Sequence, residues 1–161
     1  DLADIAKLPG VKMLLRGNHD YWWSSIAKLR SALPEGMYAL QNDSILLGDM
    51  AICGTRGWTF PTEQLPLDDQ EMKIYRRELI RLRMALDSAR KTGKPILAMT
   101  HYPPLLTDYR DTGFTALLEE YGVEMCVFGH LHGAGIRNGF RASITELNTD
   151  LFPATRLIFL P

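Results

Sequence analysis

The chain has 161 residues, 46% of them hydrophobic, and 18 Lys and Arg residues nearly balance 19 Asp and Glu residues. This length suits a single domain with one sizeable core. The balanced charge gives no electrostatic basis for nucleic acid or an anionic membrane as a main partner. No apolar run approaches the roughly 20 residues that span a membrane. Cys53 and Cys126 lie in apolar runs and are expected to be buried free thiols.

The first third of the chain predicts short helices and strands in alternation. Leu2, Ile5 and Leu8 share one face of a helix that is already under way at residue 1, and Pro9 with Gly10 ends it. The elements expected next are a buried strand over 11–15, a helix over 21–33, and short strands over 37–40, 44–47 and 50–54.

The most regular pattern lies between about residues 69 and 90. Apolar residues recur there at spacings of three and four, which predicts one long helix with an apolar stripe. Asp68 and Glu71 can cap its start as a variant of the capping box, and Gly93 with Pro95 ends it.

Charged residues crowd the same helix. It carries Arg76, Arg77, Arg81 and Arg83 together with Glu78 and Asp87. Such a set could form a basic patch, but the acidic residues among the arginines favour a solvated outer face.

Two more strands and one helix are expected before the C-terminal region. They are a strand over 96–99, a helix near 114–121 and a strand over 124–128. Residues 135–160 alternate between polar and apolar types, which predicts antiparallel strands.

All four histidines follow apolar, strand-like runs. His19 follows 13–15 through a short loop, His101 follows 96–99 through one residue, and His130 and His132 follow 125–128. Sites in open α/β sheets assemble outside the carboxyl ends of strands, and imidazole is the commonest metal-binding side chain. The pattern therefore predicts a convergent histidine cluster and a metal centre.

Each motif also has a simpler interpretation when it is taken alone. His130 and His132 point to one face of an extended segment, but a lone His-x-His spacing can arise by chance. His101 before a Tyr-Pro-Pro loop can be structural, and Gly-Asn-His-Asp can be a turn capped by Asp20. The tryptophans and tyrosine near these strand ends can stack on a ligand or simply pack beneath the loops.

The order of the three motifs resembles the calcineurin-like metallophosphoesterase family, and the resemblance covers the whole chain. The closest likeness is to bacterial members with Leu-Leu-Arg-Gly-Asn-His-Asp-Tyr-Trp-Trp, as in 14–23, and Cys-Gly-Thr-Arg-Gly-Trp, as in 53–58. The resemblance implies an α/β fold of two packed β-sheets flanked by helices. It also implies hydrolysis of phosphomonoesters or phosphodiesters by a water activated at a binuclear metal centre.

Two family motifs are missing from this chain. Family members open with a strand carrying Asp-x-His and continue with a strand ending in Gly-Asp, and neither occurs here. We therefore expect residues 1–161 to be the C-terminal portion of a single metallophosphoesterase domain, truncated at its N-terminus. If two ions are nevertheless held, Asp20 and Asp49 are the first candidates for a bridging carboxylate.

The resemblance also implies roles for individual residues. Asn18, His101 and His130 would ligate the second metal ion and His132 the first. His19 would act as general acid, with Asp20 orienting its imidazole. The cofactors would be two divalent or transition metal ions, for which Mn, Fe and Zn all suit the ligand types.

Arg56, also at a strand exit, is a candidate to position the phosphate of the substrate. The expected partner is a phosphate-ester substrate, a nucleotide included, with no membrane partner and a cytoplasmic location. Two alternatives stay open: a non-catalytic scaffold with this fold, and a mononuclear metal-binding domain without turnover.

Overall fold

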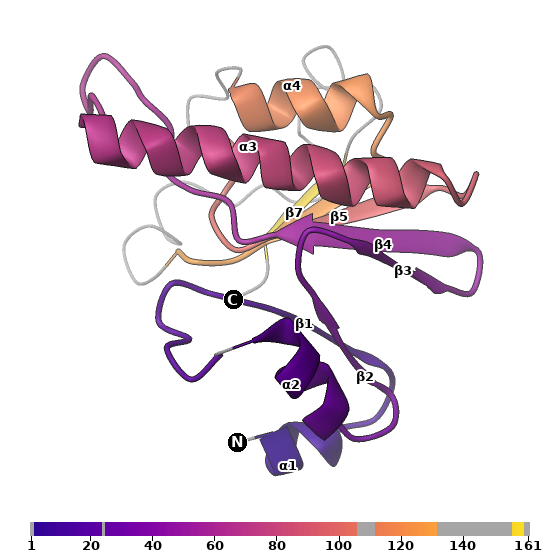
Figure 1. The fold of residues 1–161 in the computed structure, drawn as a ribbon. Coiled ribbons are helices and arrows are strands. Elements are labelled where there is room, and N and C mark those ends of the chain that lie inside the picture. The colour runs from indigo at the N-terminus through magenta and orange to yellow at the C-terminus, as the bar shows by residue number, and fades with distance from the viewer. Residues whose placement is uncertain (1, 24, 106–111, 132–155, 160–161) are drawn as a thin grey trace.

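The computed structural model describes residues 2–23, 25–105, 112–131 and the backbone of 156–159. The helices are α1 (Leu2–Ala6), α2 (Ile26–Ala32), α3 (Asp69–Arg90) and α4 (Gly113–Glu120). The strands are β1 (Lys12–Leu15), β2 (Met37–Leu40), β3 (Ser44–Leu47), β4 (Met50–Thr55), β5 (Ile96–Thr100), β6 (Met125–Phe128) and β7 (Arg156–Phe159). They form two sheets flanked by helices (Figure 1), which confirms the predicted α/β class.

The smaller sheet pairs β1 with β2 in parallel, and the larger has the order β3-β4-β5-β6-β7. Only β3 runs antiparallel to its neighbour in the larger sheet. Thr55, Thr100 and Phe128 stand side by side in the register at the carboxyl ends of β4, β5 and β6. The loops that leave these three strands therefore start from one edge.

The tail differs from the prediction where the structure describes it. Arg156–Phe159 pairs with β6 in parallel, although the alternating pattern favoured antiparallel strands. Residues 129–155 are long enough for the crossover that parallel pairing needs, so the alternation could not fix strand direction. The remainder of the predicted tail lies outside the described residues.

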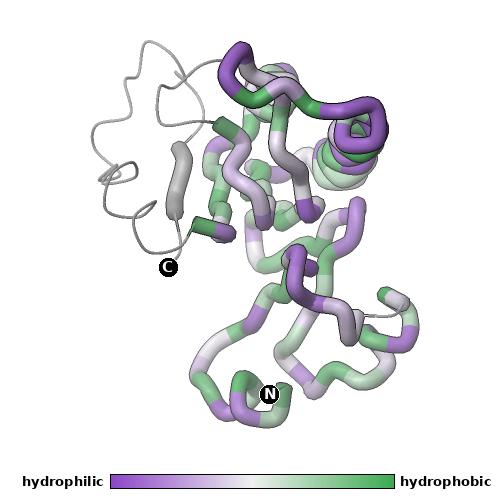
Figure 2. Tube along the Cα trace, turned by 90° about the vertical axis from the view of Figure 1, so that its left-hand side faces the viewer, coloured by the Kyte–Doolittle hydropathy of each residue, from purple (hydrophilic) through white to green (hydrophobic). Residues whose placement is uncertain are grey.

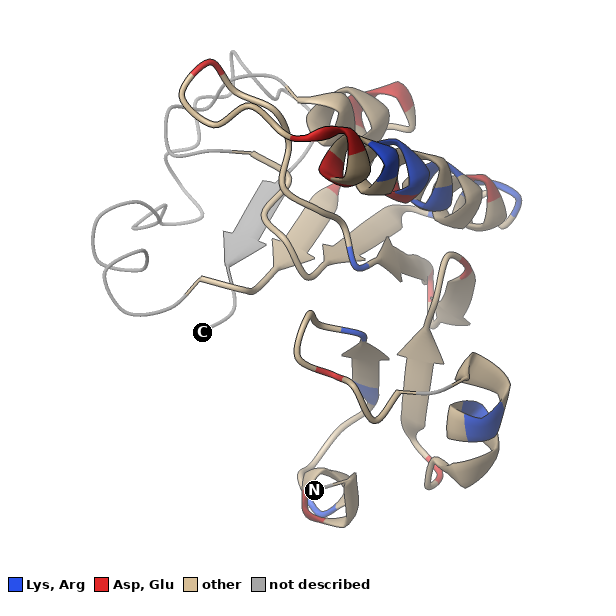
Figure 3. Ribbon diagram, turned by 60° about the vertical axis from the view of Figure 1, so that its left-hand side comes forward, with Lys and Arg blue, Asp and Glu red and all other residues tan. Residues whose placement is uncertain are grey.

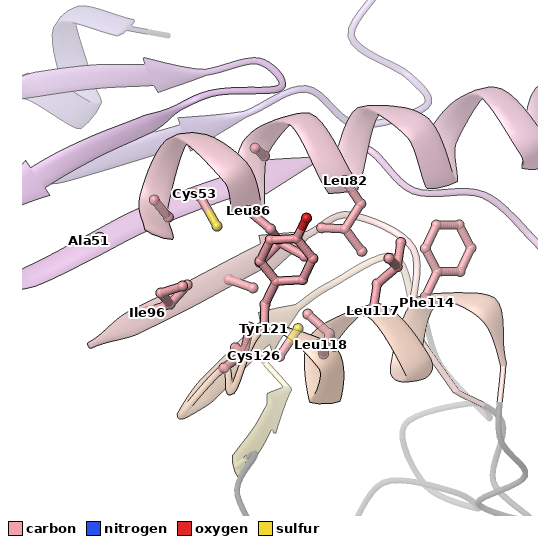
Figure 4. Close-up of a cluster of buried hydrophobic side chains, with 14 of the residues drawn as sticks. Ala51, Cys53, Leu82, Leu86, Ile96, Phe114, Leu117, Leu118, Tyr121 and Cys126 are labelled. Carbon is pink, nitrogen blue, oxygen red and sulfur yellow. The ribbon is translucent and has the colours of Figure 1, made fainter. Parts of the chain in front are cut away.

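Helix α3 follows the prediction closely. Asp68 accepts a hydrogen bond from the Glu71 amide at 2.8 Å and the Glu71 carboxylate accepts from the Asp68 amide at 3.3 Å, completing the capping box. Figure 2, in which α3 is seen nearly end-on, shows both hydrophilic and hydrophobic residues in the helix. Leu82 and Leu86 are fully buried on that face, where they meet Phe114 of α4 and strands β4 to β6 (Figure 4).

The interpretation of the charged residues on α3 was wrong at one position. Glu78 was expected on a solvated outer face, but it is fully buried. Its spacing of four from Leu82 places it on the packed stripe, where Thr55 donates to its carboxylate at 2.8 Å. The periodicity contained this information, but the residue type suggested solvent.

Helix α2 begins five residues later than predicted. The amide of Tyr21 donates to the carbonyl of His19 and that of Trp23 to Asp20, so the preceding loop continues as a tight turn. Ser25 then caps the helix by accepting a hydrogen bond from the Lys28 amide.

Both cysteines are buried free thiols, as predicted. Cys53 and Cys126 lie in the core between α3, α4 and the sheet (Figure 4), and burial raises the pKa of each thiol to about 12. Across the described residues, no helix is long and apolar enough to cross a membrane.

Candidate metal centre

Three of the predicted ligands meet at the edge where β1, β5 and β6 end. Nε2 of His101 lies 2.7 Å from Oδ1 of Asn18 and 3.1 Å from Nδ1 of His130. The two imidazole rings are 4.9 Å apart and nearly perpendicular, at 77°. Residues separated by 83 and by 29 positions along the chain thus bring three donor atoms together.

Backbone hydrogen bonds fix the loops that carry these side chains. The amides of His101 and Tyr102 both donate to the carbonyl of Arg56, at 3.0 and 2.9 Å. The amide of Gly129 donates to the carbonyl of His101 at 3.2 Å, which ties the end of β6 to the end of β5. His130 has a φ of 74°, a conformation that non-glycine residues adopt rarely and mostly at functional sites.

The two contacts of His101 cannot both be ordinary two-centre hydrogen bonds. Nε2 of a neutral imidazole carries either one hydrogen or one lone pair. If Nε2 donates to Asn18, it has no lone pair for His130, and if it accepts from His130, it faces the Asn18 oxygen without a hydrogen. A cation between the three atoms removes this conflict, because every one of them can then use a lone pair.

The surroundings of His101 favour its neutral, metal-binding form. Burial first, and then electrostatic interaction with His130, lower the pKa of His101 to about 4. The negative charge of Asp20 opposes this effect only in part. The imidazole of His101 is therefore neutral at physiological pH.

Aromatic rings pack against the histidine side chains of the site. Tyr102 is buried, and its ring lies 4.1 Å from that of His130 in a tilted stack. Trp58 packs against Tyr102 at 5.2 Å, and the guanidinium of Arg56 lies 4.8 Å from the centre of a Trp58 ring. Of the two interpretations that the sequence allowed for these aromatics, Trp58 and Tyr102 fit packing beneath the loops.

Asp20 is placed differently from the expectation. One carboxylate oxygen accepts from the Gly17 amide at 2.6 Å and the other from the indole of Trp22 at 3.0 Å. Within the described residues Asp20 makes no hydrogen bond or ion pair with His19, and the two hydrogen bonds that its carboxylate accepts lie within the loop that carries His19. The reason is local: the turn brings the Gly17 amide onto the carboxylate.

The other residues predicted for the site are not among the three that converge. His19 is exposed on the loop, with the ring of Tyr21 6.5 Å from its own. His132 lies outside the described residues. Asp49 sits at the opposite end of β4 in an ion pair with Lys94, so it is remote from the three donors.

The sequence analysis did not predict the buried cluster of charged residues formed by Glu78, Arg81 and Arg56. The Arg81 guanidinium contacts the buried Glu78 carboxylate at 2.6 Å, and that of Arg56 approaches it at 3.7 Å. An acidic residue at an apolar position of the α3 stripe was the available signal.

The fold and this site define an α/β domain with histidine and asparagine donors gathered at strand ends. A family model described as calcineurin-like phosphoesterase matches residues 2–134, and the chain belongs to this family. No curated protein and no solved structure gives a significant match. The family hydrolyses phosphoesters and generally uses divalent metal ions.

The donor set fits one such ion. Two ligands about 2.1 Å from a shared ion lie about 3 Å apart when their bonds are perpendicular, and the contacts here are 2.7 and 3.1 Å. Two imidazoles and an amide oxygen suit Mn, Fe or Zn alike. Among the described residues there is no group of three or more His, Cys, Asp or Glu that could hold an ion, so Asn18 is needed to complete the set.

Proposed function

We propose that this chain carries the second-metal half of a binuclear phosphoesterase site, which hydrolyses phosphate monoesters or diesters with water. One observation supports this most: Asn18, His101 and His130 bring three donor atoms together, and the two contacts of His101 Nε2 cannot both be ordinary two-centre hydrogen bonds. Membership of the phosphoesterase family gives the reaction class.

In this proposal Asn18, His101 and His130 hold the second metal ion and His132 ligates the first. Ions bound there would activate a water molecule and neutralise charge on the phosphate. Tyr102 keeps the His130 ring in place by stacking on it, and the Arg56 carbonyl fixes the start of the His101 loop.

His19 is the proposed general acid. Its imidazole is exposed on the loop that also carries Asn18, where a substrate can reach it. A ring nitrogen of His19 would donate its proton to the leaving-group oxygen, or steady the charge on a phosphate oxygen. Asp20 contributes by holding the loop through Gly17, which positions His19 indirectly.

The proposed substrates include nucleotides. A reducing compartment, such as the cytoplasm, is the proposed location, because both cysteines are free thiols. Arg56 is proposed to help position a phosphate of the substrate, since its carbonyl accepts from the amide of His101.

The test is to assay the complete protein with Mn²⁺ on an aryl phosphate monoester and on the matching diester, and to repeat both assays after chelation. We expect turnover that disappears on chelation and returns with the metal. A bias between the two esters assigns the substrate class. Tight metal binding without turnover would favour a non-catalytic scaffold, and one ion per chain without turnover a mononuclear binding domain.

A further inference from the structure

A cavity beside the metal centre is lined by arginines. It has a volume of about 230 Å³ and lies where the ends of β1, β2 and β4 meet the first half of α3. The arginines that line it are Arg16, Arg56, Arg77 and Arg81. Figure 3 shows the basic residues that run along α3. Two of these arginines belong to segments that carry proposed ligands: Arg16 precedes Asn18 by two residues, and the carbonyl of Arg56 accepts from the His101 amide at 3.0 Å.

The positive charge in this cavity is only partly compensated. Glu78 is the one acidic residue among those that line it. Its carboxylate is engaged by Arg81 at 2.6 Å, by Arg56 at 3.7 Å and by the Thr55 hydroxyl at 2.8 Å. Four guanidinium groups against one carboxylate leave a net charge of +3 around the cavity, by formal count (4 − 1).

Some nitrogen atoms of these guanidinium groups lack hydrogen-bond partners among the described residues. Nε of Arg16 and Nε of Arg56 are buried, and neither has a hydrogen-bond partner within the described part of the chain. Arg77 makes no hydrogen bond or ion pair there either. Buried donors without partners are costly, and this cost is removed when an anion accepts from them.

We propose that this cavity binds a phosphate group at a second site, separate from the metal centre. Guanidinium groups match the oxygens of phosphate in pairs. The volume is below the roughly 300–1,000 Å³ of pockets for drug-sized ligands, so it suits a phosphate group with a few waters rather than a whole nucleotide. The phosphate is either free inorganic phosphate or a second phosphate on a substrate held at the metal centre; the latter source alone depends on the proposed function.

The first experiment measures binding of inorganic phosphate to the complete protein by calorimetry in excess chelator, so that phosphate cannot bind through a metal ion. Arg16→Gln and Arg77→Gln are each expected to weaken binding about tenfold, since each removes a charge-assisted contact. Arg76→Gln is the matched control, because Arg76 is exposed on the same helix but does not line the cavity. Equal affinity in all three variants and the unmodified protein would overturn the proposal.

A second variant is expected to increase the affinity for phosphate rather than to lower it. Glu78→Gln keeps an acceptor for Thr55 and removes the negative charge, which frees Arg56 and Arg81 for the anion. Phosphate should then bind several-fold more tightly, provided that circular dichroism shows native folding. A folded variant that binds phosphate no more tightly than the unmodified protein would contradict the proposal.

The two sources are distinguished by kinetics. If the cavity holds a second substrate phosphate, Arg77→Gln raises KM for a bisphosphorylated substrate about tenfold and leaves KM for a monophosphate unchanged. If it holds free phosphate, both KM values stay the same while the calorimetric affinity falls. The calorimetry requires no turnover, so failure of the proposed phosphoesterase activity would not affect it.

Discussion

Nδ1 of His130 lies 3.1 Å from Nε2 of His101, although the two histidines belong to different strands. Their strands are adjacent and parallel, with Thr100 opposite Phe128 at the carboxyl ends. Two side chains that follow such a pair must leave the sheet side by side, so the contact is a direct consequence of strand order. The variants below test what the contact is for.

Loss of His101 is expected to remove metal binding. His101→Ala deletes the central donor of the three, while Asn18 and His130 remain. Loss of a residue that merely supports a ligand costs about 10–100-fold in metal affinity, so loss of the ligand itself should cost at least as much. Titration calorimetry with Mn²⁺ on the complete protein measures this, with His19→Ala as the control because His19 is not among the proposed ligands. Equal losses in both variants would contradict the assignment.

His19→Ala is expected to keep its metal and lose turnover. The loss should be about 10²–10⁴-fold if proton donation is the main role of His19. It should be smaller for a substrate with a good leaving group, such as a nitrophenyl phosphate, than for an alkyl phosphate, since a good leaving group needs no proton. Steady-state rates on the two substrates provide the measurement. A variant that releases a metal ion would instead make His19 a ligand.

Gly54→Ala is expected to destabilise the fold strongly. A Cβ at this position in β4 would collide with the carbonyl oxygen of Met99 in the neighbouring strand. Overpacking of this kind typically costs about 1–3 kcal/mol, and backbone on the facing strand should place Gly54→Ala at the upper end. Urea unfolding gives the free energy. Gly129→Ala is the control, because a Cβ there meets no described residue within 4 Å, and its stability should change little.

The buried thiols predict a loss of stability at alkaline pH. Unfolded cysteines lose their protons above about pH 9, whereas Cys53 and Cys126 keep theirs to about pH 12 in the folded protein. The folded state therefore binds more protons than the unfolded state in this window, and stability falls as the pH rises. The slope is up to about 1.4 kcal/mol per pH unit for each thiol. Urea unfolding between pH 8 and 11 checks this, and Cys53→Ala should reduce the slope.

The thiols also allow a direct chemical test. In the native protein at pH 8 neither Cys53 nor Cys126 should react readily with a disulfide reagent such as DTNB, because both are buried and protonated. Both should react after unfolding in guanidinium chloride. Rapid modification of the native protein would show that one of them is accessible.

The sequence predicted the helices and most strands because their signals are local. The capping box of Asp68 and Glu71 and the apolar runs before His101 and His130 depend on neighbouring residues alone. The convergence of His101 and His130 could also be anticipated, since they follow neighbouring parallel strands whose carboxyl ends lie at one edge of the larger sheet. Their assignment as ligands rests on the family resemblance.

What the sequence could not provide depends on distant contacts. Glu78 is charged, so its type indicated solvent, and only the packing of α3 against β4 buries it beside Thr55. Asp20 could have bonded to several groups, and the turn geometry selected the Gly17 amide. The direction of β7 depends on pairing with β6, which the alternation of Arg156–Phe159 does not encode.

The three donors also belong to different sheets. Asn18 follows β1 of the smaller sheet, whereas His101 and His130 follow β5 and β6 of the larger one. An ion held by all three would cross-link the sheets, and the unfolded chain would not bind it as well. Binding of the ion would then raise the free energy of unfolding. At a free ion concentration 100 times Kd, the increase is about 2.7 kcal/mol. The stability of the folded protein would thereby depend on the concentration of available metal.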